Sequence, residues 1–290
     1  MKGIIIDYGA TIDSNGKHWS EVIWEGYCNC SLPVTKEQFR EAYIYTERFL
    51  AFTPAIQPEY NFYELMQARV GIQLNYLLQQ GALSEDILNT TLRVFSEGEV
   101  PIMEDLNDLT THFADVIAGH CYDYARRCTM EAAPIIEHFC EKYDCALVSN
   151  FYGNLSAVLQ DFGLLRCFRH VIDSAVVGVR KPDPEIFQLA IDKLGFPPEE
   201  IYAIGDNFRK DIEPAVKLGC KGIWIKGVSW NSKDNDIEYE PSVTSLLQLY
   251  DILLYFLFFT KYYPSQNQVF SWDFSFSCAL KHVVFVFSDT

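Results

Sequence analysis

Several polar residues in this sequence stand directly after short apolar runs, where strands would end. In chain order they are Asp7 with Thr11, Ser149 with Asn150, Lys181, and Asp206 with Asp211. A carboxylate such as Asp7 can attack phosphorus as a nucleophile, and further carboxylates can hold Mg²⁺, a hard cation that prefers oxygen ligands. A lysine and a hydroxyl can bind phosphoryl oxygens and stabilise the charge that develops on them. Together these residue types indicate chemistry at a phosphoryl group.

The elements that position these residues follow from the pattern around them. Apolar runs bounded by turn residues predict buried strands at 3–7, 145–148, 170–174, 201–204 and 222–225. The segments between them predict helices near 134–142, near 154–163, from Pro182-Asp183-Pro184 onwards and around 209–218. Strands that alternate with helices predict a parallel sheet covered on both faces. Because parallel strands end at one edge of their sheet, we expect the polar residues to converge there.

A long helical region separates the first strand from the rest of the sheet. Periodic apolar stretches predict helices at 36–52, 61–80 and 105–127. The many aromatic residues of this region are expected to pack in its core. We therefore predict an α/β fold: a Rossmann-like parallel-sheet core (1–14 and 131–250) with an inserted α-helical cap (15–130). The apolar, aromatic segment 251–290 follows neither pattern, and whether it adds strands, covers an apolar patch, contacts a partner or is a non-native extension stays open.

Composition narrows the class of partner. The 290 residues carry a formal net charge of −16, which argues against nucleic acid or an anionic membrane surface as a partner. The apolar run 252–259 is too short to span a bilayer. The nine cysteines show no metal-ligand spacing beyond Cys28-Asn29-Cys30, and Asp7 interrupts the N-terminal apolar run too early for a signal peptide. These features predict a cytoplasmic protein with reduced thiols, and the sequence leaves its oligomeric state open.

The motifs that carry the polar residues resemble those of the haloacid dehalogenase-like (HAD) hydrolase superfamily. They are Asp7-Tyr8-Gly9-Ala10-Thr11, Leu147-Val148-Ser149-Asn150, Arg180-Lys181-Pro182-Asp183-Pro184, and Gly205-Asp206-Asn207 with Asp211. Their order and spacing fit over about residues 1–250, and the insertion looks like the first-type cap of that family. The resemblance implies that Asp7 is a nucleophile that forms an aspartyl-phosphate with a small phosphorylated substrate. It implies substrate binding by Thr11, Ser149, Asn150 and Lys181, and Mg²⁺ binding by Asp7, Gly9, Asp206 and Asp211.

Gly9 departs from the family pattern. Phosphatases of the family carry a second aspartate at this position, which protonates the leaving oxygen and later activates water. The backbone carbonyl that contacts Mg²⁺ there survives in glycine, so the resemblance implies an intact metal site without its proton donor. A positioned general acid contributes about 10²–10⁴-fold to rate. We therefore expect alkyl phosphate esters to suffer more than aryl or acyl phosphates, whose leaving groups are stable.

Four other functions compete with a phosphatase. A true dehalogenase is disfavoured because Asp206 and Asp211 are present. A phosphonatase-like C–P hydrolase would use a cap lysine as a Schiff base, and Lys17 and Lys36 are the lysines available between residues 14 and 133. A catalytically silent HAD-like protein is the third alternative, although a binding module has no need of the nucleophile Asp7. The first motif also echoes the phosphate turn of sugar kinases, but the sequence shows no second glycine-rich phosphate loop.

Residues near the first motif could restore acid–base function. Asp13 and His18 lie where the chain leaves the sheet for the cap, and a histidine titrates near neutrality. We expect His18 to be a linker residue that faces solvent. Tyr8 should point away from Asp7 because side chains alternate along a strand.

Overall fold

A parallel sheet forms the framework of the fold. The computed structural model describes residues 1–96, 103, 105–227 and 236–249. Its strands are β1 (Gly3–Ile6), β2 (Asp144–Ser149), β3 (His170–Asp173), β4 (Ile201–Gly205), β5 (Lys221–Ile225) and β6 (Ser242–Val243). They lie in the order β3-β2-β1-β4-β5-β6 and every pair is parallel. The predicted α/β, Rossmann-like class is therefore confirmed; the sequence did not predict β6, which has two residues and no apolar run of its own.

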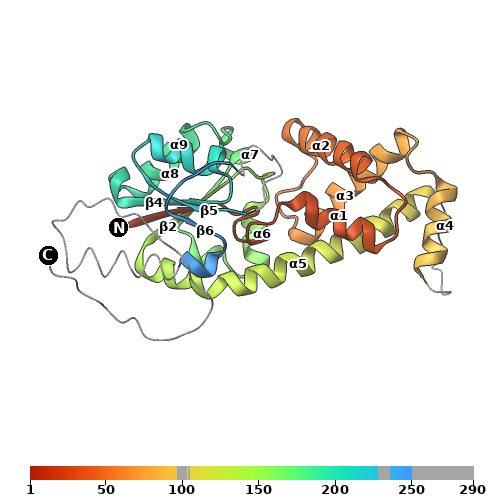
Figure 1. The fold of residues 1–290 in the computed structure, drawn as a ribbon, viewed down its shortest axis with the longest axis horizontal. Helices are drawn as coiled ribbons and strands as arrows, with labels where there is room; N and C mark the ends of the chain where they lie inside the picture. The colour runs from red at the N-terminus through yellow and green to blue at the C-terminus, as the bar shows by residue number, and fades with distance from the viewer. Residues whose placement is uncertain (97–102, 104, 228–235, 250–290) are drawn as a thin grey trace. The chain divides into compact units, whose positions relative to one another are not determined.

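Helices cover both faces of the sheet. After β2 the chain forms α6 (Leu155–Asp161), η1 (Leu165–Cys167), α7 (Ser174–Val177), α8 (Glu185–Leu194), η2 (Pro198–Glu200), η3 (Phe208–Ile212) and α9 (Glu213–Lys217). Ile5, Val148 and Ala203 from the strands pack with residues of α8 and α9 in one buried apolar cluster. In Figure 1, α8 and α9 lie on one side of the sheet and the C-terminal part of α5 (Leu106–Lys142) lies on the other. Burial on both faces explains why the strands are continuous apolar runs.

The register of the sheet aligns its central strand ends. Ile6, the last residue of β1, pairs with Leu147 of β2 on one side and with Ile204 of β4 on the other. The residues that follow these three strands therefore emerge side by side at one edge. The sheet order places β1 in the middle, so Asp7 stands between the polar residues of its neighbours.

The insertion between β1 and β2 is helical, as predicted. Its helices are α1 (Trp19–Asn29), α2 (Lys36–Phe52), α3 (Phe62–Gln79), α4 (Glu85–Phe95) and α5. Both α2 and α3 begin with a capping box. The side chain of Thr35 or Asn61 accepts from the backbone N–H of the third helical residue, and the backbone N–H of Thr35 or Asn61 donates to the side chain of that third residue. The predicted starts near 36 and 61 reflect these caps. Several aromatic residues of the insertion pack on one another, as in the contact of Trp24 with Phe39.

The last helix of the insertion differs from the prediction. Separate helices at 105–127 and 134–142 were expected, but α5 runs unbroken over 37 residues with Pro134 inside it. The proline removes one hydrogen bond to the carbonyl of Met130, and Met130 is exposed enough for water to replace it. The helix packs on α3 at one end and on β2 at the other, and these contacts hold it together across the proline.

The sheet and the helical insertion belong to one compact unit, Met1–Asp251. The segment 251–290, for which the sequence suggested several roles, lies outside the described residues. Within the described residues, no helix is both long and apolar enough to cross a bilayer.

Candidate active site

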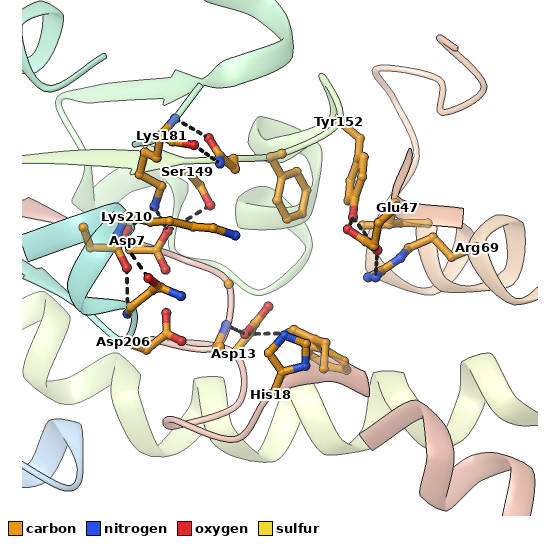
Figure 2. A pocket seen from close by; sticks show the side chains of 18 of the residues that line it. Asp7, Asp13, His18, Glu47, Arg69, Ser149, Tyr152, Lys181, Asp206 and Lys210 are labelled. Atoms are coloured by element: carbon orange, nitrogen blue, oxygen red, sulfur yellow. Dashed lines mark hydrogen bonds and ion pairs between the residues drawn. The ribbon is translucent and has the colours of Figure 1, made fainter. Parts of the chain in front are cut away.

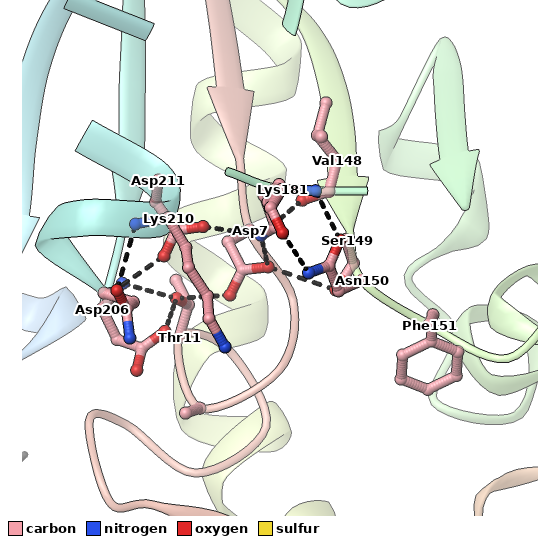
Figure 3. Close-up of polar contacts among 12 residues, drawn as sticks. Asp7, Thr11, Val148, Ser149, Asn150, Phe151, Lys181, Asp206, Lys210 and Asp211 are labelled. Atoms are coloured by element: carbon pink, nitrogen blue, oxygen red, sulfur yellow. Dashed lines mark hydrogen bonds and ion pairs between the residues drawn. The ribbon is translucent and has the colours of Figure 1, made fainter. Parts of the chain in front are cut away.

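The structure brings the strand-end residues together around Asp7. One carboxylate oxygen, Oδ1, accepts from Ser149 Oγ at 3.1 Å and lies 2.5 Å from Lys181 Nζ. The other, Oδ2, accepts from Thr11 Oγ1 at 2.9 Å. Figure 3 shows these contacts meeting at Asp7 from three separate segments of the chain. The carboxylate is buried and held in one orientation, as a positioned nucleophile requires.

Lys181 links two carboxylates of the site. Its side chain is 4% exposed, and Nζ lies 2.6 Å from Asp211 Oδ1 as well as 2.5 Å from Asp7 Oδ1. Burial alone would lower the pKa of Lys181, but the carboxylates of Asp211 and Asp7 outweigh burial and raise it. The lysine is therefore charged and stands where it could neutralise negative charge on a phosphoryl group.

Asn150 holds the backbone of Lys181 through two hydrogen bonds. Its amide Oδ1 accepts from the Lys181 backbone N–H at 2.8 Å, and its Nδ2 donates to the Lys181 carbonyl at 2.9 Å. Both ends of the amide are thus used to hold the loop that carries the lysine. This geometry favours a positioning role, and direct substrate binding by Asn150 stays a prediction.

Asp7, Asp206 and Asp211 form the carboxylate cluster of the site. Each offers an oxygen, and these oxygens lie within 4.8 Å of one another. Burial, together with the neighbouring carboxylates of Asp211 and Asp7, raises the pKa of Asp206. Oxygen donors crowded in this way, with Lys181 as the buried ammonium group that contacts two of them, match the ligand preference of Mg²⁺. The residues present therefore fit a divalent cation.

Local backbone features place the two distal carboxylates. Thr11 Oγ1 lies 3.3 Å from Asp206 Oδ1 and accepts from the Asp206 backbone N–H at 3.0 Å. Asp211 Oδ2 accepts from the Asn207 backbone N–H at 2.9 Å. A Cβ atom at position 205 would collide with the Asp211 side chain, so glycine is required there for η3 to approach β4. Glycine at position 205 is therefore a packing requirement of the site.

Open space surrounds Gly9. A Cβ atom built on Gly9 meets nothing within 4 Å, and its backbone does not need the left-handed region. The predicted contact of its carbonyl with Mg²⁺ stays a prediction. The structure therefore has room at position 9 for the carboxylate that the sequence lacks.

The strand-end residues line a pocket to which the helical insertion also contributes. The cavity measures about 160 Å³ and is lined from the insertion side by His18, Tyr43, Glu47 and Arg69, which we call the cap wall. Arg69 is 4% exposed and its Nη2 lies 2.5 Å from Glu47 Oε1. Tyr152, from the loop after β2, donates to Glu47 Oε2 at 3.0 Å. Figure 2 shows Glu47, Arg69 and Tyr152 on the side of the pocket opposite Asp7, Ser149 and Lys181.

The prediction that His18 faces solvent is wrong. His18 caps the N-terminus of α1, where its Nδ1 accepts from the Ser20 backbone N–H at 3.2 Å, and it lines the pocket. Helix capping draws the ring inward, and burial lowers its pKa to about 4. Tyr8 is fully buried against Phe151 and is not among the pocket residues, in keeping with its predicted direction.

The two cap lysines lie away from the pocket. Lys17 Nζ is 2.6 Å from Glu25 Oε1, and Lys36 Nζ is 2.7 Å from Glu21 Oε2. The lysines that line the pocket are Lys181, in the loop between α7 and α8, and Lys210, in η3, and neither belongs to the insertion. This arrangement offers no support for a cap Schiff-base lysine.

Several pocket residues were not predicted, among them Lys210, Glu47, Arg69 and Tyr152. Lys210 is exposed and reaches over the strand-end residues in Figure 3; its place directly before Asp211 was an available signal. Glu47, Arg69 and Tyr152 carried no such signal, because helix packing alone brings them to the pocket.

Comparison with known proteins agrees with this arrangement. A family model described as haloacid dehalogenase-like hydrolase matches residues 20–219. The haloacid dehalogenase-like hydrolase domain-containing protein 3 of Danio rerio is 33% identical over 103 residues, which cover 36% of this chain and 43% of that protein. A glyceraldehyde 3-phosphate phosphatase of Pyrococcus furiosus is 36% identical over 90 residues, 30% of this chain and 37% of that one. A phosphoserine phosphatase of Thermus thermophilus is 40% identical over 63 residues, 22% and 25% of the two chains.

These matches span less than half the length of the curated relatives. Among solved structures, one described as a dehalogenase with intermediate complex superposes with a TM-score of 0.54 at 17% identity, over 87% of this chain and 96% of that one. That likeness concerns the fold. The family model spans more than half of the chain, and the motifs it contains meet at one pocket. The chain belongs to the haloacid dehalogenase-like hydrolases.

Proposed function

We propose that this protein hydrolyses the phosphate ester of a small metabolite in a Mg²⁺-dependent reaction through an aspartyl-phosphate at Asp7. The observation that carries the proposal is the environment of the Asp7 carboxylate. It is fixed by Ser149, Thr11 and Lys181, and it shares a buried cluster with Asp206 and Asp211. The phosphatase names of two relatives support the same class of substrate.

The reaction has two steps at phosphorus. A carboxylate oxygen of Asp7 forms a bond to phosphorus while the bond to the leaving oxygen breaks, and that oxygen takes up a proton. Water then attacks the phosphorus of the aspartyl-phosphate, which releases phosphate and restores Asp7. Lys181 and the hydroxyls of Ser149 and Thr11 orient the phosphoryl group and stabilise its charge. Asp206, Asp211, Asp7 and the Gly9 carbonyl would hold Mg²⁺, which would supply further charge neutralisation.

The pocket supports a small substrate. Its volume of about 160 Å³ is below the roughly 300–1,000 Å³ of sites for drug-sized ligands. The carboxylates Asp206 and Asp211 argue against halide chemistry, which needs no such cluster.

The proposal includes a division of the chain into a core (1–14 and 131–250), a cap (15–130) and an extension (251–290). A cytoplasmic location is also proposed, in line with the eight unpaired cysteines among the described residues.

The test is hydrolysis of acetyl phosphate, p-nitrophenyl phosphate and a hexose phosphate, with and without Mg²⁺. We expect metal-dependent turnover that Asp7→Asn abolishes and that the control Asp192→Asn, an exposed change on α8, leaves intact. Turnover that survives in Asp7→Asn would contradict the proposal. No turnover by the wild-type protein on any of the three would favour a catalytically silent protein instead.

A further inference from the structure

The missing proton donor leaves a chemical gap that a neighbouring residue is placed to fill. The site holds a nucleophile, phosphoryl-binding groups and a carboxylate cluster, yet position 9 is a glycine beside open space. Expulsion of an alkoxide from phosphorus without a proton is slow, so a hydrolase of alkyl esters needs an acid close to the leaving oxygen. Two titratable pocket residues follow the first motif closely in the chain, Asp13 and His18.

Asp13 lies next to the position of the absent carboxylate. Its Oδ1 accepts from the Ala10 backbone N–H at 2.7 Å and from Trp19 Nε1 at 2.9 Å. Two bonds join the Ala10 nitrogen to the Gly9 Cα atom, so Oδ1 lies no more than about 5.5 Å from that atom. Asp13 lines the same pocket as Asp7, and Figure 2 shows it between the strand-end residues and His18.

The two oxygens of Asp13 have different tasks. Both hydrogen bonds that hold the side chain go to Oδ1. In the described part of the chain Oδ2 makes no hydrogen bond, and it can therefore carry a proton without breaking the turn.

We propose that Asp13 is the proton donor to the leaving oxygen, in place of the aspartate absent from position 9. The inference rests on the proposed phosphatase function. As the Asp7 oxygen bonds to phosphorus and the phosphorus–oxygen bond of the ester breaks, the proton on Asp13 passes to the leaving oxygen, which departs as an alcohol. When water attacks the aspartyl-phosphate, the Asp13 carboxylate takes a proton from it. The cycle consumes one ester and one water and returns Asp13 to its protonated form.

The electrostatic setting agrees with this role. Burial raises the pKa of Asp13 to about 7, against the partial relief given by its hydrogen bonds from Trp19 and Ala10. An acid with a pKa near the working pH both gives and regains a proton readily. The titratable and charged groups around it are Asp7, Tyr8, His18, Tyr43, Arg69 and Cys128.

His18 is the weaker candidate. Its pKa of about 4 leaves the ring neutral at pH 7, and its Nδ1 is committed to capping α1. A neutral imidazole that already serves as a cap is poorly suited to donate a proton in each cycle. The geometry therefore separates two residues that their positions in the sequence did not.

Asp13→Asn tests the proposal because the amide oxygen keeps both hydrogen bonds of Oδ1 and removes only the acid. The quantity to compare is kcat/KM for a hexose phosphate, p-nitrophenyl phosphate and acetyl phosphate, since kcat/KM reports formation of the aspartyl-phosphate. We expect a loss of about 10²–10⁴-fold on the hexose phosphate and a much smaller loss on the two activated esters. We also expect the fall in wild-type kcat/KM above pH 7 on the hexose phosphate to disappear in the variant.

A second variant guards against a structural explanation. Adding Gly9→Asp to Asp13→Asn places a carboxylate in the open space, and we expect it to restore most of the hexose phosphate activity. Equal losses on all three esters, or no loss, would overturn the proposal. So would a wild-type protein that cleaves acetyl phosphate through Asp7 but not the hexose phosphate, a result that leaves the nucleophile intact. Failure of all three esters with the wild-type protein would instead overturn the phosphatase function itself.

Discussion

The two walls of the pocket are built in different ways. The strand-end wall consists of residues at the ends of β1, β2 and β4, whose relative positions the sheet register sets, together with Lys181 from the loop between α7 and α8. The cap wall is held by side-chain contacts between helices, such as that of Glu47 on α2 with Arg69 on α3. A sheet edge places chemical groups through its backbone, whereas helix packing places them through side chains. We infer that the chemistry resides in the first wall and the choice of substrate in the second.

The largest effect is expected from removing the positive charge of Lys181, which lies at the centre of the strand-end wall. Lys181→Met keeps the side-chain length but leaves Asp7 and Asp211 buried without their partner. We expect the free energy of unfolding to fall by about 3–5 kcal/mol, the usual cost of breaking a buried ion pair from one side. Urea denaturation measures it.

The matched control is Lys217→Met, which removes an exposed i,i+4 pair with Glu213. We expect a change of no more than about 0.5 kcal/mol there. Similar losses in the two variants would show that the buried contacts of Lys181 do not stabilise the sheet edge.

The segment between the two walls supplies a test that depends on pH. Asp13 titrates near 3.9 when unfolded and at about 7 when folded, so the folded state holds the proton more tightly. The stability this gives is complete below pH 4 and is lost as pH rises through 7. The wild-type protein should therefore weaken relative to Asp13→Asn by on the order of 3 kcal/mol between pH 4 and pH 8. Thermal unfolding across that range measures the difference, and a constant difference would contradict a raised pKa.

Stabilisation of the folded protein by Mg²⁺ should depend on residues of the strand-end wall and not on those of the cap wall. Mg²⁺ at 100 times its Kd should stabilise the folded protein by about 2.7 kcal/mol. Asp206→Asn should abolish this gain, because it removes a member of the carboxylate cluster. Glu47→Gln, in the cap wall, should keep it. Thermal unfolding with and without Mg²⁺ distinguishes the variants, and an equal loss of the gain in both would place the ion elsewhere.

The smallest effect is expected where the loop after β2 meets the cap wall. Tyr152→Phe removes the hydroxyl that donates to Glu47 and should cost about 1 kcal/mol. In a double-mutant cycle with Glu47→Gln, the coupling should be of similar size. A coupling near zero would mean that the hydroxyl and the carboxylate do not interact in solution.

The same difference between the walls explains what the sequence could predict. Asp7, Ser149 and Asp206 follow apolar runs, so their convergence follows from strand alternation and parallel pairing. Arg69 shows no such context: in the sequence it is one charged residue within a helix, and only tertiary packing buries it against Glu47 and Tyr152.

Pro134 shows a second limit of prediction. Local preference places a helix boundary before a proline, but contacts of α5 with α3 and β2 override that preference. His18 follows the same rule, because it faces a pocket whose other walls come from residues distant in the sequence. Elements set by local pattern were predictable, and those set by packing partners were not.

Because α5 is long and unbroken, a small bend at Pro134 would displace the far end of the insertion by several ångströms. Phe113, near its far end, lies 21 residues from Pro134, or about 32 Å at 1.5 Å per residue. A change of about 5° at the proline, where one backbone hydrogen bond is absent, would displace Phe113 by about 3 Å. Helix α3 packs along α5 and carries Arg69, so such a bend would move Arg69 as well. A small angular change at Pro134 would therefore be amplified at the cap wall.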